Sequence, residues 1–232
     1  MACGVASGCP QQDTAKETTS GQASNVFRTA AEYIASLQLP SGWDVYTDEG
    51  DLNGDGLADV VILATGRKKC MISEVHVLLR TPHNTLVPVV SDNLGCNSSL
   101  EVQTSTEVKS GNLFVTMAAW KGADTTYQFH WNNRFFELIG MRTHVVSGGL
   151  GDEPIFTADT DFNLRTGTAL FKRRVYADRS PGELPPPADR RPTRVHAQGP
   201  KCALDKLTFE PLFCANDWKA GDTTVGDLML IK

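Results

Sequence analysis

The chain has 232 residues, of which 41% are hydrophobic, so it can bury the core of one domain with an appended segment. Its formal net charge of −5 is mild and argues against a general nucleic-acid-binding protein or a binder of acidic membranes. No stretch of the sequence is long and apolar enough to span a bilayer.

Residues 1–23 are rich in Ser, Thr, Gly and Gln, and this composition predicts a flexible tether. The tether contains no charged and apolar signal peptide, but the Ala-Cys at its start resembles the processed end of a bacterial lipoprotein. In that interpretation Cys3 carries a lipid anchor and Cys9 is left without a partner. The alternative is a disulfide between Cys3 and Cys9.

The six cysteines predict disulfides, because they form an even set without a C-x-x-C pair and without histidines at zinc-finger spacing. Disulfides persist in oxidising compartments, so we expect an exported protein of the periplasm or cell envelope. Many connectivities are open, but proximity along the chain suggests the pairs Cys70 with Cys96 and Cys202 with Cys214. The alternative is a set of reduced, mostly buried thiols.

A helix is predicted from Asn25 to Leu39. Its apolar residues recur at helical spacing and form one stripe that faces the core: Phe27, Ala30, Ala31, Ile34 and Leu37. Ser24 or Asn25 can cap its start, and Pro40 followed by Gly42 ends it.

The next feature is the motif DLNGDGLAD, residues 51–59, which has the pattern of a Ca²⁺-binding loop. Oxygen-bearing side chains recur along it and one carbonyl group adds a further oxygen, so the predicted ligands are Asp51, Asn53, Asp55, Leu57 and Asp59. Gly56 stands where such a loop must turn sharply. Carboxylates gathered on one tight loop repel one another, and a divalent cation neutralises them. We therefore predict Ca²⁺ as the cofactor.

The motif departs from an EF-hand loop at its end. The twelfth position is Ile62 rather than a bidentate Glu, and residues 60–63 are an apolar run, so Asp59 is the predicted closing ligand. A loop of this pattern that leads directly into a strand resembles the calcium loops of FG-GAP or VCBS-type repeats and, more distantly, of dockerins. The repetition that makes a propeller is missing. The alternative is a metal-free turn rich in Asp, Asn and Gly.

Beyond the loop the sequence predicts strands separated by short turns. The predicted strands are residues 58–64, 74–81, 85–90, 113–120, 125–131, 134–139, 155–164 and 168–176. Asn132 and Asn133 are expected to form a hairpin turn, because asparagine tolerates positive φ. Strands that follow one another through short turns favour an antiparallel meander, so the predicted fold class is α+β, β-rich overall, with one N-terminal helix.

The order of motifs in residues 25–176 also resembles a group of exported bacterial proteins that carry a single calcium-type loop. The resemblance rests on GDLNGDGLADVVIL, a following strand with LLR, the later WNNRFFELIG and an F-x-L-x-T-G hairpin. It implies a location in the bacterial cell envelope and implies no reaction.

After Tyr176 the composition changes. The proline-rich stretch 180–192 predicts a linker or long surface loop between a calcium-loop domain, 24–179, and a C-terminal segment, 193–232, that docks back onto it. Basic residues gather on both sides of Tyr176, from Arg165 to Arg194, and a solvated basic face is the default interpretation. The sharper alternative is a docking patch for an acidic protein partner, formed by Arg173, Arg174, Arg190 and Arg191.

The sequence contains no recognised catalytic motif, and its five histidines are scattered. Asp159, Asp161 and Asn163 share one face of a predicted strand, either as a carboxylate or second metal site or as a polar outer face. We expect a non-enzymatic, exported calcium-binding protein that acts through protein-protein binding. The most specific hypothesis is an immunity protein that inhibits a secreted antibacterial toxin. The alternative is an envelope hydrolase or carbohydrate-binding module with a structural calcium site.

Overall fold

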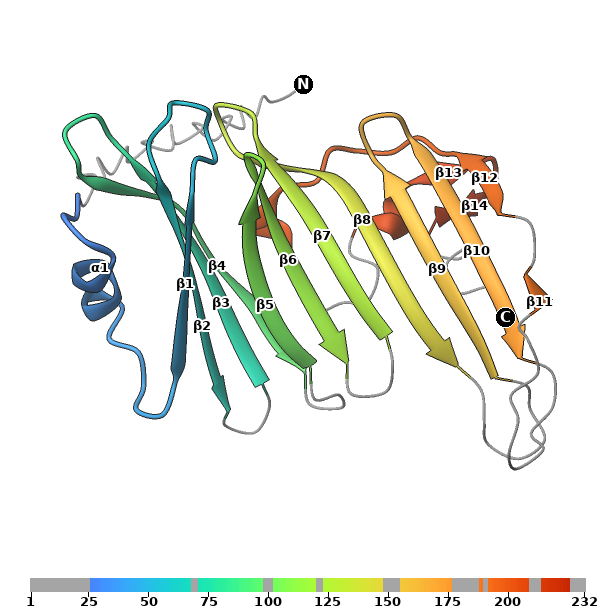
Figure 1. Cartoon of the computed structure of the whole chain (residues 1–232), viewed down its shortest axis with the longest axis horizontal. Coiled ribbons are helices and arrows are strands. Elements are labelled where there is room, and N and C mark those ends of the chain that lie inside the picture. Colours follow the sequence, from blue (N-terminus) through green and yellow to red (C-terminus); the bar gives the residue numbers. More distant parts are fainter. Residues whose placement is uncertain are drawn as a thin grey trace, which may run out of the picture.

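The computed structural model describes residues 26–67, 71–97, 102–119, 123–147, 155–176, 188–189, 192–208 and 214–225. These residues form an antiparallel β structure with a single α-helix near the N-terminus (Figure 1). The prediction of a β-rich chain with one N-terminal helix is confirmed. The described fold is nearly all β, because this helix has only 7 residues. No helix in the described part of the chain is long and apolar enough to cross a membrane.

Two meanders make up the main sheets. The first sheet has the order β1-β2-β3-β4, with β1 (Asp44–Gly50), β2 (Asp59–Arg67), β3 (Met71–Arg80) and β4 (Leu86–Asn97). The second sheet runs from β5 to β11 in chain order, with β5 (Val102–Lys109), β6 (Asn112–Ala119), β7 (Ala123–Trp131), β8 (Phe136–Ser147), β9 (Ile155–Asn163), β10 (Thr168–Tyr176) and β11 (Ala188–Asp189). A further strand, β12 (Thr193–His196), also pairs with β10.

The strand β2 is buried on both faces. Val61 and Leu63 belong to the main core, which contains residues of both sheets, whereas Val60 and Ile62 pack in a second cluster with the N-terminal helix. Side chains alternate between the two faces of a strand, so VVIL supplies both clusters from four consecutive residues. An uninterrupted apolar run is what a strand needs when neither face meets water.

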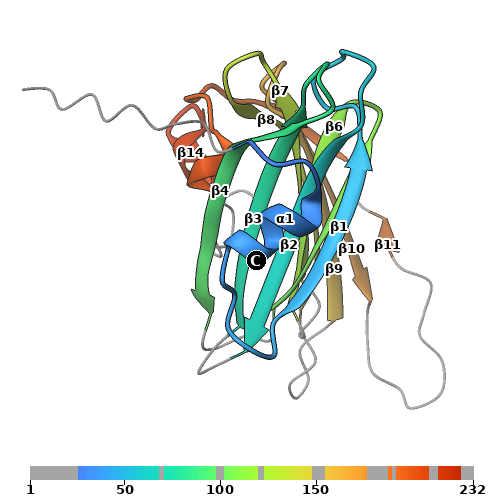
Figure 2. The same cartoon turned by 90° about the vertical axis from the view of Figure 1, so that its left-hand side faces the viewer.

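The helix α1 (Ala30–Ser36) lies across the outer face of the first sheet (Figure 2). It starts later than predicted, because Phe27 forms two backbone hydrogen bonds with Leu86 of β4, at 2.9 and 2.7 Å. These bonds hold Phe27 beside β4, and the chain then bends at residues 28 and 29, where the Thr29 side chain caps the first turn. The predicted helix start near residue 25 is therefore wrong.

Two of the long strands, β1 and β5, were not predicted from the sequence, and neither were the short strands after Tyr176. The acidic sequence of β1, DVYTDEG, is typical of a turn, but β1 is an edge strand, where charged residues are common. In β5 the inward positions are Val102, Thr104, Thr106 and Val108, and the two central threonines weaken the usual apolar signal of a half-buried strand. Consequently, the loop of residues 51–58 connects the hairpin β1–β2, and it does not join the helix directly to the first strand.

The C-terminal segment packs behind β8–β10 (Figure 1). It contains two short 3₁₀ helices, η1 (Leu204–Lys206) and η2 (Ala215–Asp217), and a small hairpin of β13 (Lys219–Ala220) and β14 (Thr223–Thr224). Trp218 stands edge-on against Phe162 of β9, with ring centroids 5.2 Å apart. The described part of this segment therefore belongs to the main core.

His76 is a buried polar residue under the helix. It lies on β3, is 2% exposed, and its Nδ1 atom is 3.0 Å from the Tyr33 hydroxyl of α1. Its Nε2 atom makes no hydrogen bond and lies 3.6 Å from a carboxylate oxygen of Glu74. Burial lowers the pKa of His76 from its ordinary value of 6.5 to about 4. The histidine is thus neutral in the folded protein down to acidic pH.

Protonation of His76 in the unfolded chain gives the fold a predictable pH dependence. Because the folded pKa is the lower one, the stabilisation is fully present above pH 6.5 and is lost as the pH falls toward 4. We expect a loss of up to about 3 kcal/mol in the free energy of unfolding over this range. A His76→Asn variant keeps a hydrogen-bond partner for Tyr33 but does not titrate. Urea unfolding at several pH values gives the free energy of unfolding as a function of pH. This free energy should fall less steeply with decreasing pH in the variant than in the wild type, and an equally steep fall would contradict the assignment.

Candidate functional site

Four of the five predicted calcium ligands lie on the connection between β1 and β2, and the fifth, Asp59, is the first residue of β2. The Asp51 carboxylate accepts hydrogen bonds from the backbone N–H groups of Gly54 at 2.7 Å, Asp55 at 3.2 Å and Gly56 at 2.9 Å. These hydrogen bonds hold the pKa of Asp51 below its usual value, and the bond from Gly56 has the largest effect. Gly56 has φ of +81°, a conformation that glycine adopts without strain, so the predicted sharp turn is present.

Asn53 and Asp55 lie side by side in the middle of the loop. Asn53 Nδ2 donates to Asp55 Oδ2 at 2.9 Å, and Asn53 Oδ1 accepts from the Asp55 N–H at 3.0 Å. The Leu57 N–H donates to the other oxygen of Asp55 at 2.8 Å. The structure therefore brings these predicted ligands together, with Asp55 exposed to solvent.

Asp59 has a different environment from the other predicted ligands. It is fully buried, with 0% exposure, and its two carboxylate oxygens accept the backbone N–H groups of Leu52 and Arg80, each at 2.8 Å. Burial raises the pKa of Asp59 and repulsion by Asp55 and Asp51 adds to the rise, while the two hydrogen bonds act in the opposite direction. Asp59 thus ties the loop to the end of β3.

The chemistry of these donors fits Ca²⁺, which prefers carboxylate, amide and carbonyl oxygens. Oδ2 of Asp51 and both carboxylate oxygens of Asp55 and Asp59 each accept one hydrogen bond, which leaves each of them a lone pair for a cation. The carboxylates do not converge on one point, however. Across the described residues, no three His, Cys, Asp or Glu side chains are grouped so that they could hold a metal ion.

The arginines predicted to form a docking patch are not all on one surface. Arg173 and Arg174 are consecutive residues of β10, so their side chains point to opposite faces of the sheet. Arg173 shares the inner face with the buried Ala169, and Arg174 shares the outer face with the exposed Leu170. The other two, Arg190 and Arg191, lie outside the described residues.

The carboxylates of β9 are paired with basic residues of β8. His144 Nδ1 is 2.7 Å from Asp159 Oδ1, and Arg142 Nη2 is 3.1 Å from Asp161 Oδ2. All four side chains lie on the solvated outer face of the second sheet, where directly opposite residues of neighbouring strands meet. This arrangement matches the predicted polar outer face: Asp161 forms an ion pair with Arg142, and Asp159 lies within hydrogen-bond distance of His144.

The predicted disulfide between Cys202 and Cys214 is confirmed, with Cα atoms 6.3 Å apart. It joins the chain just before η1 to the chain just before η2. Cys70 lies outside the described residues, as do Cys3 and Cys9, so a bridge from Cys70 to Cys96 stays a prediction.

A surface cleft that the sequence analysis did not predict lies between the β7–β8 turn and the C-terminal segment. Its volume is about 520 Å³, and its lining comprises Arg134, Phe135, residues 200–203, Asp205, Lys206 and Asp217. Three of these side chains are basic and two are acidic, and the rest of the lining is largely apolar. The cleft is therefore a candidate binding site with both charged and apolar parts.

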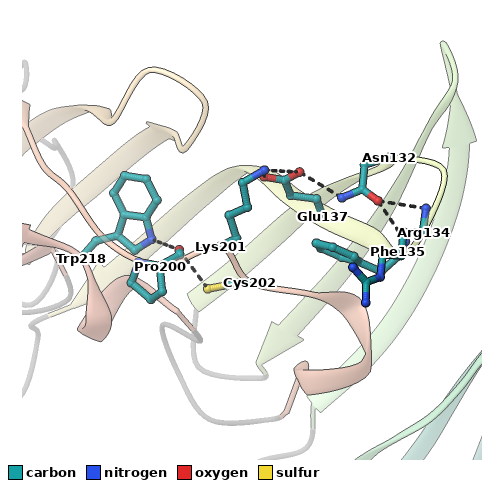
Figure 3. Close-up of polar contacts among 8 residues, drawn as sticks. All are labelled: Asn132, Arg134, Phe135, Glu137, Pro200, Lys201, Cys202 and Trp218. Carbon is teal, nitrogen blue, oxygen red and sulfur yellow. Dashed lines mark hydrogen bonds and ion pairs between the residues drawn. The ribbon is translucent and has the colours of Figure 1, made fainter.

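The β7–β8 turn forms one wall of the cleft. Asn132 Oδ1 accepts the N–H groups of Arg134 at 3.1 Å and Phe135 at 2.9 Å (Figure 3). Asn133 has φ of 70°, as expected for a hairpin turn. The connection is longer than the predicted pair of asparagines, since Trp131 pairs with Phe136 across it.

An ion pair between the exposed Lys201 and the half-buried Glu137 joins this turn to the opposite wall. Glu137 accepts hydrogen bonds from Lys201 Nζ at 3.2 Å and from Asn132 Nδ2 at 3.3 Å (Figure 3). Partial burial alone would raise the pKa of Glu137, but the bonds from Lys201 and Asn132 outweigh it and hold the pKa below its usual value. The Leu138 N–H also donates to the Cys202 carbonyl at 2.8 Å. The two walls are thus fixed relative to each other.

Comparison with known proteins gives no match: no family model fits the chain, and no curated protein and no solved structure is similar to it. The class of the protein is therefore defined by its own structure. It is an antiparallel β protein of two main sheets, with an acidic hairpin loop and a disulfide-bonded C-terminal segment.

Asp92 of β4 is a poorly solvated acid near the C-terminal wall of the cleft. Its Oδ2 atom is buried and makes no hydrogen bond. Burial raises the pKa of Asp92 to about 6, and repulsion by Asp205 contributes to the rise. We therefore expect the ionised carboxylate to weaken the contact between β4 and η1 at neutral pH.

An Asp92→Asn variant should be more stable than the wild type at neutral pH. Because the folded pKa is the higher one, the wild type loses stability as the pH rises from about 4 to about 6. We expect a gain of about 1–2 kcal/mol at pH 7.5, a figure reduced for the partial exposure of the group. The gain should vanish below pH 4. Urea unfolding at both pH values checks this, with the exposed Asp44→Asn as control; equal gains for both variants would contradict it.

Proposed function

We propose that this protein is an exported calcium-binding protein that acts by binding another protein and not by catalysis. The observation that carries the proposal is the loop of residues 51–59, where oxygen donors from carboxylate, amide and carbonyl groups occupy one tight hairpin connection. A structural clamp is the calcium role that this loop supports best, because Asp59 is buried and bonded to two separate backbone segments.

The residues that would hold the ion are Asp51, Asn53, Asp55, Asp59 and the carbonyl group of Leu57. A bound calcium ion supplies positive charge that offsets the repulsion among the three carboxylates. The chain itself holds the oxygen donors in place. Asp51 shapes the loop through three backbone hydrogen bonds, and Asp59 connects the loop to the Arg80 N–H at the end of β3. The clamp would therefore fasten β1, β2 and β3 at one point.

The location and the partner are parts of the same proposal. Export is supported by the disulfide Cys202–Cys214, since such bonds persist in oxidising compartments. Protein binding is supported by a cleft whose walls are fixed by hydrogen bonds and by this disulfide. The most specific form of the proposal is an immunity protein that inhibits a secreted antibacterial toxin. Binding to the product of a toxin gene beside its own gene would support it, and glycan hydrolysis without any protein partner would contradict it.

Removal of calcium should destabilise the protein. Binding to the folded state alone adds about 2.7 kcal/mol at a hundredfold excess of calcium over Kd, because the added stability is RT ln(1 + [Ca²⁺]/Kd). For a chain of this size that corresponds to a fall of about 5–10 °C in Tm when EDTA is added. Melting curves followed by circular dichroism, with and without EDTA, measure the change.

Two variants show whether the loop is responsible for that change. Asp55→Asn removes one charge from the loop and keeps an acceptor for the Leu57 N–H, so it should lose most of the response to EDTA. Asp124→Asn makes the same chemical change on an exposed position of β7 and should keep the full response. If EDTA leaves the wild-type Tm unchanged, calcium has no place in this protein.

A further inference from the structure

The cleft between the β7–β8 turn and the C-terminal segment has two preformed walls. Asn132 holds the turn through two backbone N–H groups. The opposite wall is held by the Cys202–Cys214 disulfide and by a hydrogen bond from Trp218 Nε1 to the Pro200 carbonyl at 3.0 Å (Figure 3). The cleft has a volume of about 520 Å³, which lies within the rough range of 300–1,000 Å³ of small-ligand sites. A preformed cleft binds without the entropy cost of ordering its walls.

The charges of the lining are only partly compensated. Lys201 pairs with Glu137 at 2.9 Å, and Lys206 lies 3.9 Å from Asp205. Arg134 and Asp217 are lining charges that form no ion pair within the described parts of the chain. One cation and one carboxylate of the cleft are thus open to charges on a ligand.

Apolar groups make up most of the remaining lining. Phe135 is half-buried at the turn, and Pro200 and Ala203 contribute from the other wall. An aromatic ring of a ligand can pack against such groups and gain the usual stabilisation of apolar burial. The lining of the cleft therefore fits a ligand with an apolar group, a negative charge and a positive charge close together.

We infer that this cleft binds an exposed loop of a protein partner in which an aromatic residue is flanked by one acidic and one basic residue. The aromatic ring packs against Phe135 and Pro200. The acidic residue pairs with Arg134, where a guanidinium group can bind a carboxylate through two N–H groups. The basic residue pairs with Asp217. This inference rests on the proposed protein-binding function and assigns a surface and a ligand chemistry to it.

The net charge of the protein makes this inference testable with short peptides. At −5 the protein as a whole attracts basic peptides and repels acidic ones. A preference for a peptide with an acidic residue over an otherwise identical basic peptide must therefore come from a local cation. The probes are the blocked pentapeptides acetyl-GEFKG-amide, acetyl-GKFKG-amide and acetyl-GEGKG-amide.

The experiment is a titration of the full chain, labelled with ¹⁵N, with each peptide. We expect acetyl-GEFKG-amide to shift the amide signals of residues 134, 135, 201 and 217 and to saturate in the millimolar range or below. The peptide without an acidic residue and the peptide without phenylalanine should each bind at least about fivefold more weakly. Equal binding of all three peptides, or shifts that do not map to the cleft, would overturn the inference.

Charge reversal provides the matched test. Arg134→Glu should weaken acetyl-GEFKG-amide at least about fivefold and improve the binding of acetyl-GKFKG-amide, because the local charge is inverted. Arg194→Glu makes the same change on an exposed residue of β12 and should alter neither affinity by more than about twofold. Equal Tm values of the two variants show that both are folded. Equal effects of the two variants on binding would sink the inference, and so would no effect of either.

This test separates the cleft from the wider proposal. If the peptides fail to bind while EDTA still lowers Tm, the cleft assignment is wrong and the calcium clamp stands. If the peptides bind as expected and EDTA has no effect, the cleft stands and the calcium clamp is wrong.

Discussion

The fold depends on covering the inner face of the second sheet. This face carries buried apolar side chains from Leu113 on β6 to Ala169 on β10, and each large one contributes about 1.5–3 kcal/mol when it leaves water. The first sheet contacts this face near β5, while the C-terminal segment packs behind β8–β10 (Figure 1). The disulfide lies within this segment of little regular structure, and the Lys201–Glu137 ion pair joins the segment to β8, so both hold part of the main core in place.

Both faces of the first sheet also carry apolar side chains that must be covered. Its inner face packs on the second sheet, and its outer face is covered at the centre by α1. A helix of 7 residues is too short to be stable alone, so α1 depends on the contacts of Tyr33 with β2 and β3. This arrangement places a neutral His76 beneath the helix, where burial lowers its pKa to about 4.

The sequence predicted the strands that carry a strong period-two pattern, as in β3, and the fully apolar β2. It failed for β1 and β5 because an acidic edge strand and a strand with inward threonines lack that pattern. The loop motif identified residue types and the turn at Gly56, but not the burial of Asp59, which depends on the Arg80 N–H from 21 residues later in the chain. A local motif has no information on such a partner.

The charged residues of the surface also show that a local pattern in the sequence does not reveal which residues meet in the fold. Arg173 and Arg174 are adjacent in the sequence, yet the alternation of β10 sends them to opposite faces. Arg134 and Asp217 are far apart in the sequence, yet they line one cleft because the C-terminal segment must return to cover the second sheet. Such a surface forms because the segment packs on the core. Its charges come from residues of the segment and of the turn that remain exposed to solvent. Charge clusters in a meander with a returning segment should therefore be sought where the segment crosses a turn, and not where charged residues run together in the chain.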